Sequence, residues 1–198
     1  MSRQGLFDAL EPPPMATDRI FFAIMPDADA IADIVALTAR LKTQHGMRGR
    51  PTADTKLHVT LHHLGDFAGM PHAKVASAKR AAEAAAKAMA TFVACFDTAQ
   101  SFVTRRNNRP LVLTGDDGVI GIAALHRALA SAMPKAGLPP IPASYTPHIT
   151  LLYDDITALP QPVAPVEWRV RELLLLHSRL GQGQPYTALG RWPLRGQS

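Results

Sequence analysis

The sequence predicts an α+β fold of two similar lobes, each an antiparallel sheet with helices on its outer side, facing one another across a central cleft. A strand–helix–strand pattern occurs twice, in residues 19–63 and 110–153. Each copy ends on a closely similar tetrapeptide, His58-Val59-Thr60-Leu61 and His148-Ile149-Thr150-Leu151. With 198 residues, of which 47% are hydrophobic, the chain has the size and composition of a single domain.

The first repeat starts with a β-rich segment, Arg19 to Met25. Pro26-Asp27 opens a helix that we expect to end near Gly46, because its apolar positions recur at three- and four-residue spacing: Ile31, Ile34, Val35, Leu37 and Leu41. The first motif lies in the expected strand Leu57 to Leu64. A second, alanine-rich helix begins after Gly69-Met70-Pro71 and runs to Ala90.

The second repeat follows a long expected strand, Thr91 to Val103. A polar turn with three arginines should connect this strand to the strand Leu111 to Thr114, so that the two strands form a hairpin. A helix over residues 118–135 and a proline-rich loop then lead into the second motif strand, residues 148–153. Residues 166–176 and 185–192 are again strand-like.

Residues 1–18 are interpreted as a flexible lead-in, and residues 19–198 as one domain of two lobes. The lead-in lacks the apolar core of a secretory signal and contains Pro12-Pro13-Pro14. No apolar segment approaches the roughly 20 residues of a membrane span. A single cysteine, Cys95, excludes an intramolecular disulfide framework, so we expect a cytoplasmic protein.

The repeated motif is the strongest functional signal. The chance of finding two copies of His, Val or Ile, Thr and Leu in this order is on the order of 10⁻⁴. On a strand, the histidine and threonine of each copy point to one face. Two imidazoles can serve as general acid and general base near neutral pH, and hydroxyls can donate hydrogen bonds to phosphate oxygens. His58 and His148 are therefore candidate catalytic residues, and Thr60 and Thr150 candidate phosphate-binding residues.

On these motifs the chain resembles the 2H phosphoesterases, in particular the bacterial 2′-5′ RNA ligase-like proteins, also described as RNA 2′,3′-cyclic phosphodiesterases. The similarity extends from about Arg19 to Leu194 and includes the closing segment, residues 186–194. The resemblance implies a bilobal fold, with His58 as general acid and His148 as general base. It also implies opening of a terminal cyclic phosphate to a 2′-phosphate, with reversible 2′-5′ ligation, and without metal or other cofactor. The sequence alone does not distinguish the roles of the two histidines.

Further substrate contacts are expected around the motifs. His62 should share the face of His58, and His63 should point to the other face. The family often has a basic residue five positions after the second histidine, where this chain has Tyr153, followed by two aspartates. A cation for the phosphate could instead come from the arginines of two loops: Arg105, Arg106 and Arg109, or Arg48 and Arg50.

The net charge of +5 favours anionic partners, here RNA 3′ ends or small cyclic-phosphate nucleotides, and no obligatory protein partner is indicated. Three alternatives stay open: a phosphodiesterase for small cyclic nucleotides, a non-catalytic RNA- or nucleotide-binding module, and a zinc enzyme. The spacing of His58 and His62 suits zinc on a helix but not on a strand, where the two residues are about 13 Å apart. The binding module would not need the paired histidines.

Overall fold

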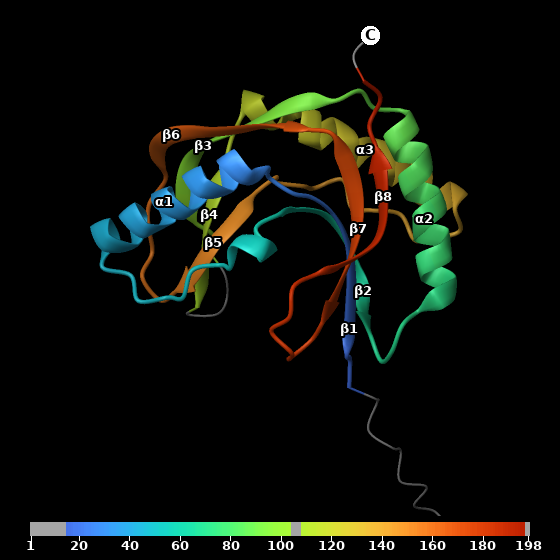
Figure 1. Ribbon diagram of the computed structural model, residues 1–198, viewed down its shortest axis with the longest axis horizontal. Helices are drawn as coiled ribbons and strands as arrows, with labels where there is room; N and C mark the ends of the chain where they lie inside the picture. The colour runs from blue at the N-terminus through green and yellow to red at the C-terminus, as the bar shows by residue number, and fades with distance from the viewer. Residues whose placement is uncertain (1–14, 104–107, 197–198) are drawn as a thin grey trace, which may run out of the picture.

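The computed structural model describes residues 15–103 and 108–196, which form an α+β fold of three helices and one antiparallel sheet (Figure 1). The sheet has eight strands in the order β6-β3-β4-β5-β2-β1-β7-β8. The predicted α+β class is therefore confirmed, but the strands form one sheet instead of a separate sheet in each lobe. Most of the expected lead-in, residues 1–14, lies outside the described residues.

The first strand–helix–strand repeat consists of β1 (Asp18–Ile24), α1 (Ala28–His45) and β2 (Val59–Phe67). The carboxylate of Asp27 accepts a hydrogen bond from the Ala30 amide and so caps α1 at its start. Gly46, with a φ of 66°, ends the helix in the left-handed conformation that glycine adopts without strain. A 3₁₀ turn (Asp54–Lys56) leads into β2.

The second repeat consists of β4 (Arg109–Thr114), α3 (Ile120–Lys135) and β5 (Ile149–Asp154), with a 3₁₀ turn (Asp117–Val119) before the helix. Helix α2 (His72–Lys87) and strand β3 (Phe92–Ser101) connect the two repeats. The chain ends with β6 (Gln161–Val170), β7 (Glu172–Arg179) and β8 (Thr187–Pro193).

The expected strand-like segment 166–176 is divided between two strands in different parts of the sheet. β6 ends at Val170 and pairs with β3 at one edge, whereas β7 begins at Glu172 and pairs with β1 and β8. The amide of Leu194 donates to the carbonyl of Arg171, the residue between the two strands. The end of one strand and the start of the next could not be recognised in this continuous β-forming segment, because local propensity does not specify the partner strand with which each part pairs.

The sheet consists of two four-stranded halves that are joined at one point. β6, β3, β4 and β5 form one half and β2, β1, β7 and β8 the other; only Val59 and Ile149 pair across the junction. These two residues are the central positions of the two motifs. The motif strands are thus neighbours in the middle of one sheet rather than parts of two separate sheets.

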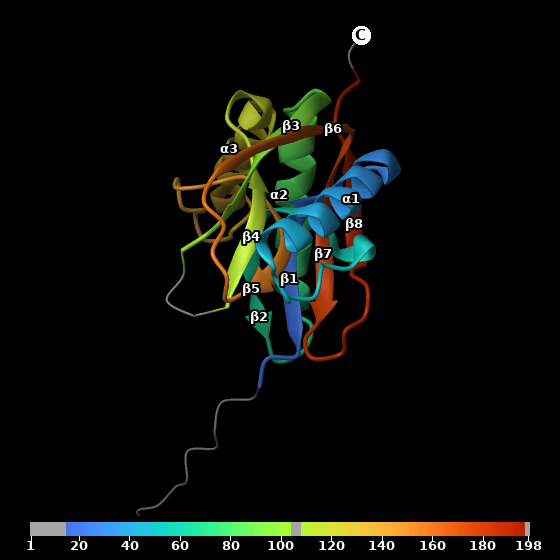
Figure 2. The ribbon, with the colours of Figure 1, turned by 90° about the vertical axis from the view of Figure 1, so that its left-hand side faces the viewer.

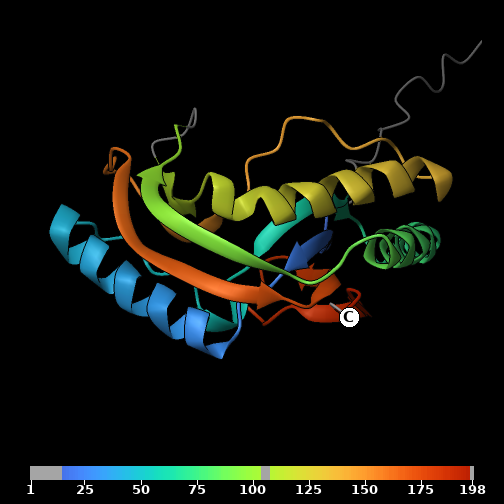
Figure 3. The same ribbon diagram turned by 90° about the horizontal axis from the view of Figure 1, so that it is seen from above.

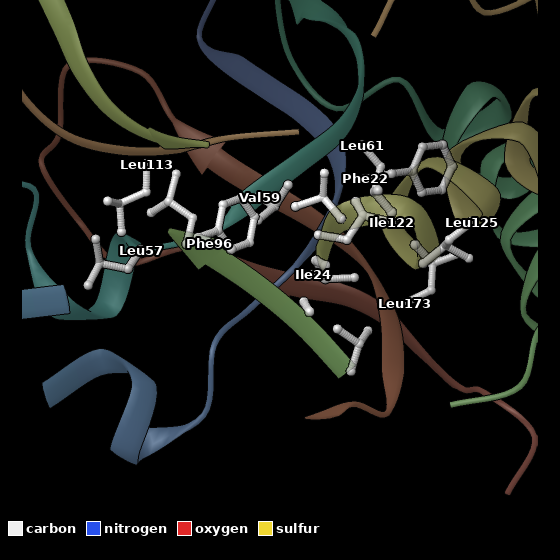
Figure 4. Packing of buried hydrophobic residues seen from close by; sticks show 14 of the residues in the cluster. Phe22, Ile24, Leu57, Val59, Leu61, Phe96, Leu113, Ile122, Leu125 and Leu173 are labelled. Carbon is white, nitrogen blue, oxygen red and sulfur yellow. The ribbon is translucent and has the colours of Figure 1, made fainter. Parts of the chain in front are cut away.

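The helices hold the two halves together. Although α1 belongs to the first repeat, it packs on β6 and β5 of the other half, while α3 packs against β3, β2 and the helix α2. Figures 2 and 3 show α1 and α3 on either side of β3 and β6. One continuous core results, in which side chains from both halves and from α3 are in one cluster (Figure 4). No helix of the described residues is long and apolar enough to cross a membrane.

Candidate active site

The two motifs are related by an approximate twofold arrangement about the Val59–Ile149 pair. Because this pair is antiparallel, the two motifs run in opposite directions from it, so His58 and Thr150 are on one side of the pair and His148 and Thr60 on the other. Because Val59 and Ile149 are fully buried, the four polar side chains share the opposite, open face of the sheet.

Both imidazoles are held by the backbone in the same way. Nδ1 of His58 lies 2.7 Å from the carbonyl oxygen of Lys56, and Nδ1 of His148 lies 2.9 Å from that of Thr146. A carbonyl only accepts hydrogen bonds, so each Nδ1 carries the proton. The neutral forms therefore have Nε2 available to accept a proton. Nε2 of His58 lies 3.0 Å from the hydroxyl oxygen of Thr60.

A hollow of about 630 Å³ opens over the motifs. Its volume is within the range of about 300–1,000 Å³ that is usual for small-molecule sites. The lining includes both motif histidines and both motif threonines, together with Arg19, Phe21, Arg50, Pro51, Thr52, Ala53, Lys56, His63, Tyr153 and Tyr186. The structure thus brings all four principal candidates from the sequence into one hollow, which we call the cleft.

Strict strand alternation fails just after each motif. The pairing of β1 with β2 shifts register between Thr60 and His62, and the pairing of β4 with β5 shifts between Thr150 and Leu152. These β-bulges reverse the faces of the residues that follow. His63, rather than His62, consequently lines the cleft, contrary to the expectation from alternation.

His62 instead lines a second, smaller hollow beside the cleft. The register pairs His62 with Phe22, which belongs to the main core, whereas Phe21 on the other face contacts His58. His58 and His62 thus point to opposite faces of β2 and are not placed to share a metal ion. Across residues 15–103 and 108–196, no three His, Cys, Asp or Glu side chains are grouped for metal binding.

The same bulge places Tyr153 in the cleft. Tyr153 is five positions after His148, as His63 is five positions after His58, and both follow a bulge at a buried leucine, Leu151 or Leu61. The two positions are therefore equivalent in the two repeats. A tyrosine here provides an aromatic surface where the resemblance leads one to expect a cation.

Three basic side chains line the cleft, and two of them have protein partners. Arg19 makes a two-pronged ion pair with Asp66, with both distances 2.7 Å, and His63 also contacts that carboxylate at 2.9 Å. Lys56 donates to the carbonyl of Gly183 at 3.0 Å. Within the described residues, Arg50 has no hydrogen-bond or ion-pair partner.

The remaining arginine candidates are not in the cleft. Arg109 donates to the Thr157 hydroxyl at 2.6 Å and does not line the hollow. The side chain of Arg48 is exposed outside it. Arg105 and Arg106 lie outside the described residues.

Aromatic rings surround His58. The ring centroids of Phe21 and Tyr186 lie 5.1 Å and 5.3 Å from that of His58, and Phe21 and Tyr186 contact each other edge to face. Burial among these groups lowers the pKa of His58, and the nearby His148 lowers it further, while the bond to the Lys56 carbonyl acts in the opposite direction. Phe102, which lines the second hollow, contacts His148 edge-on, with the ring centroids 5.0 Å apart.

Sequence reasoning did not identify Arg19, Lys56 or Tyr186 as cleft residues. Arg19 could have been found, because it is basic and stands near the start of the strand that pairs with β2. Tyr186 comes from the loop between β7 and β8, and Lys56 from a 3₁₀ turn. Such segments have no hydrophobic periodicity from which their position relative to the sheet could be predicted.

The 2′-5′ RNA ligase superfamily model matches residues 26–182. The chain therefore belongs to this superfamily of 2H phosphoesterases, as its motifs and its fold both indicate. No curated protein sequence matches the chain.

Solved structures with the same fold cover nearly the whole chain. Escherichia coli LigT in its apo form is 27% identical, with a TM-score of 0.69 over 91% of this chain and 99% of that one. A structure described as a phosphoesterase is 26% identical, with a TM-score of 0.69 over 90% of this chain and 99% of its own. The protein TT0787 of Thermus thermophilus is 24% identical and shares the fold with a TM-score of 0.70, covering 91% of this chain and 100% of its own.

Proposed function

We propose that this protein opens a 2′,3′-cyclic phosphate at the 3′ end of RNA and leaves a 2′-phosphate, without a metal ion. The observation that carries the proposal is the approximate twofold placement of two imidazoles and two hydroxyls in one cleft, each Nδ1 bonded to a backbone carbonyl. Such a pair can move one proton onto the substrate while removing another. Structures of E. coli LigT with 3′-AMP and with phosphate, each from a protein 27% identical to this chain, support a nucleotide phosphate as the ligand.

In the proposed reaction, water attacks phosphorus as Nε2 of His148 takes one of its protons. The bond from phosphorus to O3′ breaks, and Nε2 of His58 gives its proton to the leaving oxygen. The phosphate stays on O2′. The hydroxyls of Thr60 and Thr150 donate to the non-bridging oxygens and stabilise the charge that develops there. With a 5′-hydroxyl in place of water, the same groups in the same roles would form a 2′-5′ linkage as the bond from phosphorus to O3′ breaks; the reverse of that step would cleave the linkage and restore the cyclic phosphate.

The acid role of His58 depends on the substrate. In the free protein, burial lowers the pKa of this imidazole and favours its neutral form. A bound phosphodiester carries a negative charge, and an opposite charge within a few ångströms raises the pKa of a histidine. Substrate binding would therefore favour the protonated form of His58, which then donates this proton to the leaving oxygen.

The test is incubation of a short RNA that ends in a 2′,3′-cyclic phosphate with the protein in EDTA. We expect a 2′-phosphate product, and a loss of at least about 10³-fold in kcat for His58→Ala and for His148→Ala. His72→Ala is the matched control, because this histidine is exposed at the start of α2 and outside the cleft. Activity lost in EDTA and restored by a metal ion, or products with only 3′-phosphates, would contradict the proposal.

The same assay distinguishes the alternatives. Turnover of small cyclic nucleotides but not of RNA ends would move the substrate to free nucleotides. RNA binding that is unchanged in the doubly substituted His58→Ala, His148→Ala protein, with no turnover by the unsubstituted protein, would indicate a binding module.

A further inference from the structure

The outer part of the cleft contains an exposed aromatic ring that the proposed reaction does not use. Tyr153 is 51% exposed and lines the same hollow as the motif histidines. The bulge at Leu151 is what points it there, since plain alternation would place it on the face opposite to His148. Exposed aromatic rings in grooves that bind single-stranded nucleic acid are surfaces on which bases stack.

Arg50 lines the same hollow and, among the described residues, forms no bond with the protein. Arg19 and Lys56 also line the cleft, but the first is neutralised by Asp66 and the second donates to a carbonyl. Since the Arg50 guanidinium has no partner among the described residues, its N–H donors are available to a ligand. The planar guanidinium can form two parallel hydrogen bonds to a phosphate.

The backbone that carries Arg50 is fixed to the strand that carries Tyr153. The buried carboxylate of Asp154 accepts hydrogen bonds from the amides of Arg48 at 2.7 Å, Gly49 at 2.6 Å and Ile156 at 3.0 Å. These hydrogen bonds lower the pKa of Asp154 to about 2, so this carboxylate is charged at neutral pH.

The other side of Arg50 is also fixed. Pro51 forms a bridge with Leu152, and the amide of Thr52 donates to the Leu151 carbonyl at 2.7 Å. A Cβ atom at Gly49 would lie 2.0 Å from the carbonyl oxygen of Tyr153, so only glycine permits this approach. The backbones of Arg50 and Tyr153 are therefore held in one arrangement before any ligand binds, which reduces the entropy lost on binding.

We propose that Tyr153 and Arg50 form a second nucleotide subsite, for the nucleotide on the 5′ side of the one that carries the cyclic phosphate. Tyr153 stacks on its base, and Arg50 binds the phosphodiester that links the two nucleotides. Asp154 is a positioning residue that holds the Arg50 loop in place. This inference rests on the proposed function and makes an RNA chain, rather than a free cyclic nucleotide, the preferred substrate.

The experiment compares a nucleoside 2′,3′-cyclic phosphate with a dinucleotide that ends in the same cyclic nucleotide. We expect kcat/KM to be at least about 10-fold higher for the dinucleotide, because one stacked base and one phosphate contact add binding energy of that size. Arg50→Ala and Tyr153→Ala should bring this ratio close to one, and Tyr153→Phe should keep it. Arg48→Ala is the matched control, since Arg48 is on the same loop with its side chain outside the cleft.

Asp154→Asn tests the positioning role. We expect the ratio to fall as in Arg50→Ala, with thermal unfolding measured alongside to confirm that the variant is folded. Equal kcat/KM for both substrates in the unsubstituted protein, or a ratio that survives both Arg50→Ala and Tyr153→Ala, would overturn the subsite and leave the proposed function intact.

If neither substrate is turned over, the proposed function fails and the subsite is tested by binding alone. The dissociation constants of the dinucleotide and mononucleotide 2′-phosphates, measured by titration, should then differ about 10-fold, with the difference lost in Arg50→Ala. The salt dependence of dinucleotide binding should also weaken in that variant by about one phosphate contact. Equal dissociation constants would overturn the subsite.

Discussion

The imidazole of His58 is packed against Phe21 and Tyr186, and this packing makes its protonation sensitive to what the cleft contains. Burial stabilises the neutral ring in the free protein, whereas a bound phosphate stabilises the charged ring. A general acid must be protonated to act. The pH dependence of the reaction therefore reports directly on the role of His58.

We predict that kcat/KM falls on the alkaline side at a lower pH than kcat does. The first quantity reflects the free protein, where the pKa of His58 is below its ordinary value of about 6.5, and the second reflects the complex, where the phosphate raises that pKa. Tyr186→Leu should move the alkaline limb of kcat/KM to higher pH by exposing the ring to water. Rates measured from pH 5 to 9 check this, and coincident limbs would mean that His58 is not the acid.

At the scale of elements, a hydrogen bond links the two motifs. The hydroxyl of Tyr145, three residues before His148, donates to the carbonyl of Thr60 at 3.0 Å. The ring of Tyr145 also stacks on His126 of α3 at 4.1 Å, so the segment leading into β5 is fixed to both β2 and α3.

Tyr145→Phe removes the hydroxyl and keeps the stacked ring. We expect a loss of about 1 kcal/mol in the free energy of unfolding, which lowers Tm by about 2–4 °C for a domain of this size. A lower kcat should accompany it, because the two motifs lose a link that aligns them. Calorimetry and steady-state rates measure both; Tyr145→Leu, which also loses the stacking, should be less stable still. An unchanged Tm in Tyr145→Phe would show that the bond contributes nothing.

Most elements could be predicted from periodicity, caps and turn residues, and the four motif residues from their repetition. The residues just beyond the motifs could not. A bulge adds one residue to a strand, and its presence depends on the partner strand rather than on local sequence. For this reason His62 and His63 lie on the faces opposite to those expected from strand alternation. The bulge in β5 places Tyr153 in the cleft in the same way. The loop that places Arg50 depends on Asp154, 104 positions from it in the chain, and such contacts leave no pattern in the sequence.

For the whole molecule, the way in which the helices bridge the two halves predicts cooperative unfolding. The halves meet at one residue pair in the sheet, but α1 covers β6 and β5 of the half opposite to its neighbours in sequence, and α3 contacts both β3 of one half and β2 of the other. Neither half can keep its core when the other is lost. We therefore expect a single transition rather than two.

The two tryptophans provide the measurement. Trp168 lies on β6 and Trp192 on β8, at opposite edges of the sheet. In Trp168→Phe and in Trp192→Phe, fluorescence follows one edge while far-ultraviolet circular dichroism follows all elements. Within each variant the two signals should give the same urea midpoint. Separate midpoints would show that the halves unfold independently.

The position of β1 also has a consequence for how the protein is made. Among the described residues β1 is the first strand to be synthesised, yet it lies between β2 and β7, and its Asp18 bonds to His177, 159 residues later. One edge of β1 therefore stays without its partner until β7 has been synthesised, and an unpaired strand edge can pair with other chains. Tyr186, which closes the cleft against His58, is translated later still. Nascent chains should thus acquire a working cleft only after Tyr186 has left the ribosome, and we expect them to depend on chaperones until then.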